Sequence, residues 1–333
     1  MKSALLVSAL VLAGLGATSA LAQSVISAQS GMINYTEGQV LLNGSEVQVT
    51  TTQFPQLRVE DVLSTKEGRA EVLLNPGSFL RLGENSSIRL ASSSITRPGL
   101  EVLSGSAVLE IASESKDELV TLTWKDAVLS LAKHGVFRLD TDPAELRVFE
   151  GEVSVTSAGH QVTVGKGKML PFDDTWASLK FDAERTDSLD RWSGRRASYL
   201  AMANPSSATA MMPGGYMNSG FDQSMAGCSS GLWSLNSFYG MMTYIPCRGI
   251  YNSYYGYRFY SPQSVGALYY APQHPATSAS MGGGGSPSYT RNMATSAGTS
   301  GTIAAGSPAS TTSSGASSAP ISRGSGNAGG QTR

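Results

Sequence analysis

A pentapeptide near residue 230 has the spacing of a catalytic serine. The stretch Gly227-Cys228-Ser229-Ser230-Gly231 fits the G-x-S-x-G pattern of a hydrolase nucleophile elbow. That chemistry requires a strand before the serine, a helix after it, and an acid and a histidine further along the chain. The preceding residues are rich in Met, Gly and Ser, the one later histidine is His274, and no Asp or Glu follows. We therefore predict no catalytic residues and no enzyme activity.

The two cysteines of the chain, Cys228 and Cys247, are the next candidates for chemistry. An even number of cysteines in an oxidising compartment favours one disulfide, and the alternative is two free thiols in a loose segment. Zinc takes four ligands, and no histidine lies near either cysteine in the sequence. We expect a disulfide here, no metal site and no cofactor.

An aromatic-rich segment, from Gly231 to Tyr270, surrounds the second cysteine. Aromatic rings stack on sugars or on partner side chains at a low cost in conformational entropy. The segment therefore predicts contact with an envelope protein or glycan, with self-packing onto a β-core and adhesive assembly through exposed tyrosines as alternatives. The candidate contact residues are Trp233, Tyr239, Tyr244, Tyr251, Tyr254, Tyr255 and Tyr257.

Isolated histidines and a lysine-glycine stretch carry weaker signals. His134 and His160 begin predicted strands, where we interpret each as a solvated turn residue or a satisfied residue at the rim. The stretch Gly165-Lys166-Gly167-Lys168 lacks the length and the Ser/Thr of a phosphate-binding loop, so it predicts a hairpin.

The first 22 residues have the pattern of a cleavable export signal. Lys2 is followed by the apolar run 4–13 and by the A-x-A site Ala20-Leu21-Ala22. The mature chain is then expected to start at Gln23, exported to the periplasm or the exterior of a bacterium, with no integral membrane span after cleavage. The 24 basic and 25 acidic residues form no dense basic face, so nucleic acid is not an expected partner.

Residues 23–172 have the pattern of an all-β domain. Short alternating segments such as 69–74, 79–82 and 127–131 are separated by turn signals about every 8–12 residues, as in a sandwich, barrel or roll. Three similar stretches each place a glycine, Gly38, Gly105 or Gly151, between two strand-like segments. Glycine adopts the positive φ of a tight reversal, so we predict similar hairpins of short antiparallel strands.

The remaining chain changes character twice. Residues 182–203 have apolar residues at helical spacing, with Asp182 or Thr186 as candidate caps and Asn204-Pro205 as the expected end. Residues 204–270 form a Met/Gly/Tyr-rich segment that holds both cysteines. Residues 271–333 are mostly Gly, Ser, Thr, Ala and Pro, so we expect a disordered low-complexity tail there. The chain after the helix is expected as a whole to be a largely disordered Gly/Ser/Tyr-rich tail.

Residues 75–86, 103–105, 135–139 and 148–155 form an ordered series of glycine-containing, strand-like motifs. On these motifs the β-region resembles the FecR domain family over roughly residues 39–170. The stretch from Asn75 to Ser86 is similar to the family's "D-G-S-x-hydrophobic" core, with Asn75-Pro76 where an acidic residue is usual. Residues 103–105, 135–139 and 148–155 are similar to its repeated glycine elements, in the same order. The segment Leu189-Asp190-Arg191-Trp192-Ser193 is similar to one that follows this domain in exported FecR-like proteins.

This resemblance implies a non-catalytic β-module outside the cytoplasm. FecR-type regulators join such a domain to a cytoplasmic anti-sigma region and a membrane helix, whereas this sequence begins with the pattern of a cleavable signal. The first hypothesis is therefore an exported binding and scaffolding protein of the cell envelope. The alternatives are a regulatory sensor that resembles FecR in transmembrane signalling, and a hydrolase, which the missing triad opposes.

Overall fold

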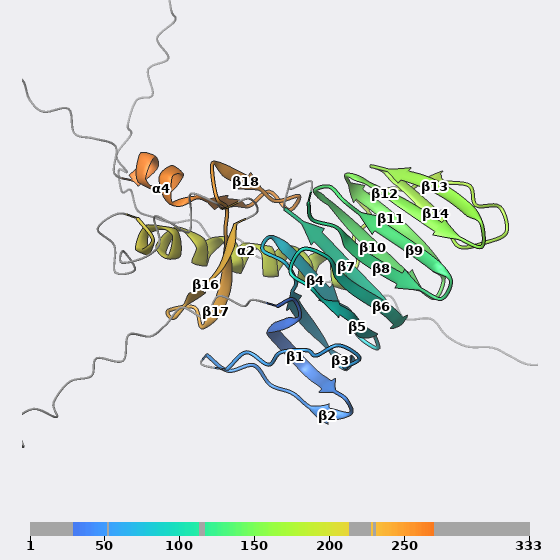
Figure 1. Ribbon diagram of the computed structural model, residues 1–333, viewed down its shortest axis with the longest axis horizontal. Coiled ribbons are helices and arrows are strands. Elements are labelled where there is room, and N and C mark those ends of the chain that lie inside the picture. The colour runs from blue at the N-terminus through green and yellow to red at the C-terminus, as the bar shows by residue number, and fades with distance from the viewer. Residues whose placement is uncertain (1–28, 52, 113–116, 213–227, 229–230, 270–333) are drawn as a thin grey trace, which may run out of the picture. The chain divides into compact units, whose positions relative to one another are not determined.

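The computed structural model describes residues 29–51, 53–112, 117–212, 228 and 231–269 (Figure 1). The expected signal peptide at 1–22 and the tail at 271–333 lie outside these residues. The described helices and strands are β1 (Met32–Leu42), β2 (Ser45–Glu46), β3 (Val62–Leu73), β4 (Ser78–Leu82), β5 (Ser87–Ser93), β6 (Pro98–Ser104), β7 (Ser106–Ile111), β8 (Val120–Trp124), β9 (Ala127–Leu131), β10 (Gly135–Thr141), β11 (Ala144–Glu150), β12 (Glu152–Ser157), β13 (His160–Gly165), β14 (Lys168–Pro171), β15 (Leu179–Lys180), α2 (Ser188–Ala210), β16 (Leu232–Asn236), β17 (Met241–Ile245), β18 (Ile250–Asn252), β19 (Arg258–Tyr260) and α4 (Pro262–Tyr269).

One sheet of 15 strands dominates the structure and confirms the all-β prediction. Its strands run in the order β13-β12-β9-β8-β6-β5-β3-β4-β7-β10-β11-β14-β15, and β1 pairs with β2 and β3. The strand pairs of this sheet are antiparallel among the described residues except for β6 with β8, which run parallel. The sheet is therefore mixed, where only antiparallel strands were predicted. Two further two-stranded sheets, β16–β17 and β18–β19, follow the helix.

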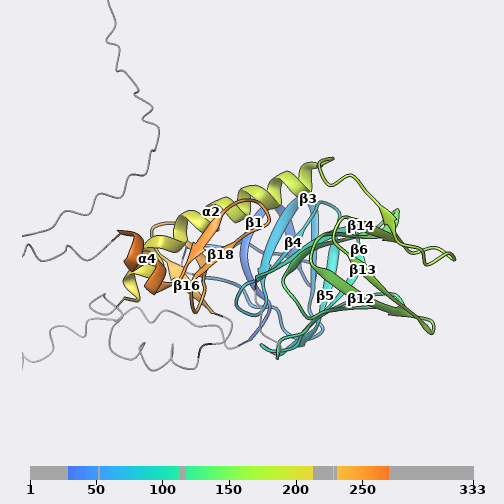
Figure 2. The same ribbon diagram turned by 90° about the horizontal axis from the view of Figure 1, so that it is seen from above.

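The large sheet folds over on itself around one apolar core. Leu100, Leu129 and Val155 come from one half of the strand order, and Leu109 and Leu146 come from the other half. All five are buried in the same cluster. Burial alternates along β8 and β9, with the period of two that places one face of a strand inward. Figure 2 shows the two layers of strands from above.

Glycines mark the positions where the chain passes from one strand to the next, but not as hairpin turns. Gly105 lies between β6 and β7 with a φ of 80°, and Gly151 lies between β11 and β12 with a φ of 83°. Neither pair of flanking strands is hydrogen-bonded together, because β6 pairs with β5 and β8 while β7 pairs with β4 and β10. The hairpin prediction is therefore wrong here, and these glycines form bends between separate parts of the sheet. Gly38 lies inside β1 at a register shift.

Helix α2 begins six residues later than predicted, and its cap explains where. The side chain of Asp187, not Asp182 or Thr186, accepts from the backbone N–H groups of Leu189 and Asp190 at 2.9 and 3.0 Å. The Asp190 carboxylate accepts in return from the N–H of Asp187 at 3.1 Å, which completes a capping box. The Asp187 side chain thereby satisfies two backbone N–H groups of the first turn, those of Leu189 and Asp190, which have no partner within the helix.

The helix also continues past Pro205, where the sequence predicted its end. Proline lacks the N–H that would bond to the preceding turn, which weakens a helix. Here the neighbouring Asn204 holds the region, because its amide donates to the carbonyls of Tyr244 and Tyr260 at 2.9 and 3.0 Å. Its side-chain oxygen accepts from the N–H of Tyr260 at 2.7 Å. Tertiary contacts thus override the local signal, and α2 reaches Ala210.

Residues 231–269, which the composition placed in a largely disordered tail, are folded against α2 and the large sheet. Trp233, Tyr244 and Phe259 are buried in one cluster with Phe79 of β4 and Leu200 of α2. The rings of Phe79 and Trp233 meet edge to face with centroids 5.1 Å apart. The folded part of the chain therefore extends beyond the helix to this segment. None of the described helices is long and apolar enough to span a membrane.

Gly151 and Gly159 have nearly the same φ, so together they test whether the bend at Gly151 requires a close approach of two backbone segments. A Cβ at Gly151 would lie 2.4 Å from the carbonyl oxygen of His134, whereas one at Gly159, with a φ of 84°, meets nothing within 4 Å. We expect Gly159→Ala to lower the free energy of unfolding by about 1–2 kcal/mol, the cost of the left-handed angle. Gly151→Ala should cost roughly 1–3 kcal/mol more because the added methyl also displaces backbone. Denaturant titration measures both, and equal losses would contradict the proposed close approach.

Candidate functional site

A buried arginine lies at the junction of the large sheet and the later segments. Arg81 of β4 is fully buried between two carboxylates from neighbouring strands. Its Nε donates to Glu71 of β3 at 3.1 Å, and its Nη1 donates to Glu110 of β7 at 2.8 Å. The ladder pairs Glu71 with Arg81 directly, so strand register alone brings these two charges together.

The helix and the aromatic segment complete this buried network. Arg196 of α2 donates from Nη2 to Glu71 at 3.0 Å. The Tyr251 hydroxyl and the Ser253 hydroxyl donate to the same Glu110 oxygen at 3.0 and 2.5 Å. Charged groups buried without partners are costly, so the sheet needs the later segments in place to satisfy its own carboxylates.

Opposite charges favour the ionised forms of Glu71 and Arg81 inside the protein. Burial by itself raises the pKa of Glu71, but the Arg196 and Arg81 guanidinium groups outweigh it and hold this pKa below its usual value. Burial tends to lower the pKa of Arg81, whereas Glu110 and Glu71 raise it. Burial and the Glu110 carboxylate also raise the pKa of Tyr251 well above its usual value, so its hydroxyl stays a donor.

The structure distributes the predicted contact residues between the interior and the surface. Trp233 and Tyr244 are only 1% and 3% exposed, and Tyr251, Tyr254 and Tyr255 are partly buried. Tyr239 and Tyr257 each keep 37% of their surface exposed. Five of the seven therefore pack within the protein, as the self-packing alternative describes. The reason is the large sheet, whose Phe79 and Glu110 give these side chains apolar and hydrogen-bonding partners.

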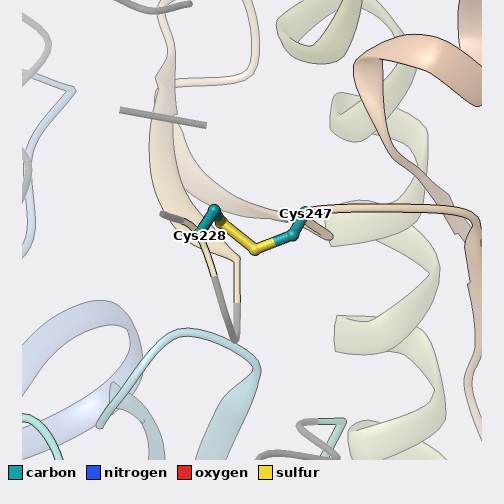
Figure 3. The surroundings of a disulfide bond; sticks show 2 residues. All are labelled: Cys228 and Cys247. Carbon is teal, nitrogen blue, oxygen red and sulfur yellow. A yellow bond between two sulfur atoms is a disulfide. The ribbon is translucent and has the colours of Figure 1, made fainter. Parts of the chain in front are cut away.

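The two cysteines are bonded to each other beside a hollow in the surface. Figure 3 shows the bond between Cys228 and Cys247, whose Cα atoms are 5.7 Å apart. The hollow, here called the disulfide cleft, has a volume of about 530 Å³. Its lining comes from the ends of sheet strands and from the disulfide-linked segment, through Ile111, Ala112, His134, Gly135, Glu150, Cys228, Tyr244, Pro246, Cys247, Arg248, Ile250, Tyr251 and Asn252.

The disulfide cleft presents polar groups of both signs around a small apolar surface. His134, Arg248 and Asn252 are exposed, and Glu150 is partly buried. Ile250 adds an apolar side chain that is 41% exposed. Such a set can hydrogen-bond and orient a polar ligand. Among the described residues no cluster of His, Cys, Asp or Glu is suited to hold a metal ion.

Sequence reasoning did not identify this cleft. His134 was interpreted as a solvated turn residue or a satisfied rim residue, and Glu150, Arg248 and Asn252 carried no motif. These residues come from three segments, at 134–135, 150 and 246–252. The last segment lies more than 90 residues after the other two, so only the folded chain brings them together. Three residues of the G-x-S-x-G stretch, Gly227, Ser229 and Ser230, lie outside the described residues.

Comparison with known proteins identifies the β-module. Residues 60–154 match the family model described as FecR protein. This region is therefore a FecR domain, and the resemblance found in the sequence is confirmed. No curated protein matches the sequence.

Two crystal structures described as an anti-sigma factor from Parabacteroides distasonis, at 2.50 and 1.65 Å resolution, are similar to part of the chain. They share 13% and 12% sequence identity with it, each with a TM-score of 0.32. The similar region covers 41% of this chain and 64% of each crystallised chain.

The buried network predicts a large difference between two arginines. Arg81→Met leaves Glu71 and Glu110 short of a buried partner, so we expect the free energy of unfolding to fall by about 3–5 kcal/mol. Arg89→Met is the matched control, because Arg89 pairs with Glu101 at 2.8 Å but is 38% exposed. Its loss should cost about 0–1 kcal/mol. Urea titration at neutral pH compares the two.

A pH series separates lost charge from lost packing. In the unaltered protein the lowered pKa of Glu71 contributes stability above the unfolded pKa, and this contribution is lost as the pH falls through the folded value. In Arg81→Met the buried carboxylates gain by protonation, so the deficit relative to the unaltered protein should shrink as the pH is lowered from 7 to 5. A deficit that stays constant would show that only packing was lost.

Proposed function

We propose that this protein is an exported, non-catalytic binding protein of the bacterial cell envelope, and that its disulfide cleft holds a glycan chain. The observation that carries the proposal is the construction of the cleft. The FecR domain supplies one wall and the disulfide-linked segment supplies the other. The hollow therefore exists only when both parts are folded together, as expected of a dedicated binding surface.

Export is supported by the sequence and by the disulfide. The pattern of residues 1–22 is that of a cleavable signal, with Gln23 as the first mature residue. Cys228 and Cys247 are bonded, and such bonds persist in oxidising compartments such as the periplasm. The proposed location is thus the periplasm or the cell exterior.

A glycan suits the shape and chemistry of the cleft better than a protein surface. Protein interfaces of standard size bury about 800 Å² on each side, and their centres are depleted in charged residues. The disulfide cleft is concave and carries His134, Arg248, Asn252 and Glu150, which can bond to several sugar hydroxyls. The aromatic ring of Tyr251 in the lining adds a surface of the kind on which sugars pack.

A regulatory sensor is the second candidate, favoured by the FecR domain itself and by an open sheet edge. Strand β13 ends the strand order and pairs only with β12 among the described strands. An edge of this kind can accept a strand from a partner protein. A photo-crosslinking residue at Thr163 of β13 would capture an outer-membrane protein if the sensor hypothesis holds, and the same residue at Arg248 would not.

The glycan proposal predicts retention of the protein on purified peptidoglycan sacculi. The protein should sediment with the sacculi, and Arg248→Ala and Asn252→Ala should each weaken this binding by roughly five-fold, as for the loss of a hydrogen bond worth about 1 kcal/mol. Both side chains are exposed, so the melting temperature should stay within a few degrees.

Arg97→Ala serves as the matched control, because Arg97 is exposed at the turn before β6 and does not line the cleft. Its sedimentation should equal that of the unaltered protein. Equal binding by all three variants, or no sedimentation of the unaltered protein, would refute a glycan site in the cleft.

A further inference from the structure

A second, smaller hollow lies between the first turns of α2 and the turn that joins β18 to β19. Its volume is about 230 Å³, and we call it the aromatic pocket. Three of the predicted contact residues, Tyr254, Tyr255 and Tyr257, line it together with Phe149 of β11. Glu150, the next residue after Phe149, lines the disulfide cleft instead, so the two hollows adjoin the end of the same strand.

The rings of the aromatic pocket are held at fixed angles. Phe149 and Tyr254 have centroids 5.8 Å apart with planes at 57°, and Tyr254 and Tyr255 have centroids 5.3 Å apart with planes at 79°. A Cβ at Gly194 of α2 would meet the Tyr255 ring at 3.4 Å, so the helix backbone supports that ring directly. Tyr257 leaves 37% of its surface exposed and forms the open side.

Carboxylates outnumber cations in the ion-pair network that includes Asp190 of the pocket lining. The single guanidinium of Arg138 contacts Asp140, Asp187 and Asp190 at 2.9, 2.7 and 3.0 Å. Arg147 lies 3.9 Å from Asp140 but also contacts the carboxylate of Glu145. Asp190 itself lines the pocket and is only 9% exposed. This network holds four carboxylates and two guanidinium groups, while the Arg81 guanidinium lies 5.7 Å from the centre of the Tyr255 ring.

The carboxylate of Asp190 also acts on the Tyr254 hydroxyl. Burial raises the pKa of Tyr254, and the carboxylates of Asp190 and Glu150 raise it further. One cation, Arg191, lies on the lining, where its Nη1 donates to the Thr186 carbonyl at 3.2 Å and its side chain is exposed. Aromatic faces attract organic cations, and a carboxylate close by adds Coulomb attraction.

We propose that the aromatic pocket binds the cationic side chain of a basic protein segment, with the ammonium or guanidinium group against the rings and toward Asp190. This contact is independent of the glycan proposed for the disulfide cleft, because it uses other residues. Tyr254, Tyr255 and Phe149 surround the alkyl stem, while Tyr257 closes the outer side. The pocket thus gives the protein a second point of attachment with its own chemistry.

Small probes test this directly on the full chain with its disulfide intact. Isothermal titration calorimetry compares Nα-acetyl-lysine methylamide and Nα-acetyl-arginine methylamide with the neutral Nα-acetyl-norleucine methylamide. At least one cationic probe should bind roughly ten-fold more tightly than the neutral probe, and added salt should reduce the difference. Equal affinities, or no detectable binding of either cation, would overturn the proposal.

Variants of opposite expected sign separate binding from damage to the fold. Tyr257→Ser should weaken the cationic probe by roughly two- to five-fold, and Tyr257→Phe should restore it because the ring face remains. Arg191→Gln should strengthen binding by roughly two-fold, because it removes a competing positive charge from the lining. A destabilised protein would not bind more tightly.

Tyr199→Ser is the matched control, since Tyr199 is an exposed tyrosine of α2, at 48%, outside the pocket lining. It should leave the affinity for the cationic probe unchanged. A Tyr257→Ser variant that binds as well as the Tyr199→Ser control would show that the rings of the aromatic pocket do not hold the cation.

Discussion

The rest of the structure depends on the burial of Arg81 between two carboxylates. One guanidinium cannot satisfy all four oxygens of Glu71 and Glu110. The Asn34 amide of β1, Arg196 of α2 and the hydroxyls of Tyr251 and Ser253 also donate to these oxygens. Polar contacts between buried groups thereby link the helix, the aromatic segment and the FecR domain.

The same constraint explains why the aromatic segment is ordered. Its glycines and small polar residues give it little local preference for helix or strand. Phe79 on the sheet gives Trp233 and Tyr244 an apolar surface, while Glu110 orients Tyr251 from the same side. Because these anchors hold the segment, its less buried rings, such as Tyr257, occupy defined positions beside the aromatic pocket.

Much of the fold could be predicted from the sequence, because it depends on local patterns. Alternation located strands such as 127–131, and Gly105 and Gly151 were correctly expected to need positive φ. Their role as bends between separate ladders depends on strand pairing, which no local pattern contains. Arg81 lies in an alternating strand with no local sign of its burial. Its carboxylate partners come from strands 10 and 29 residues away, and the two hollows draw on segments still further apart.

The hydrogen bond between Ser253 and Glu110 spans 143 residues of sequence. A ribosome that adds about 5–20 residues each second therefore needs on the order of ten seconds between the synthesis of the acceptor and of its donor. During that interval the strands around Glu110 hold a carboxylate that lacks its final partners. The final polar contacts of Glu110 with Tyr251 and Ser253 therefore form only after nearly the whole ordered chain has been made.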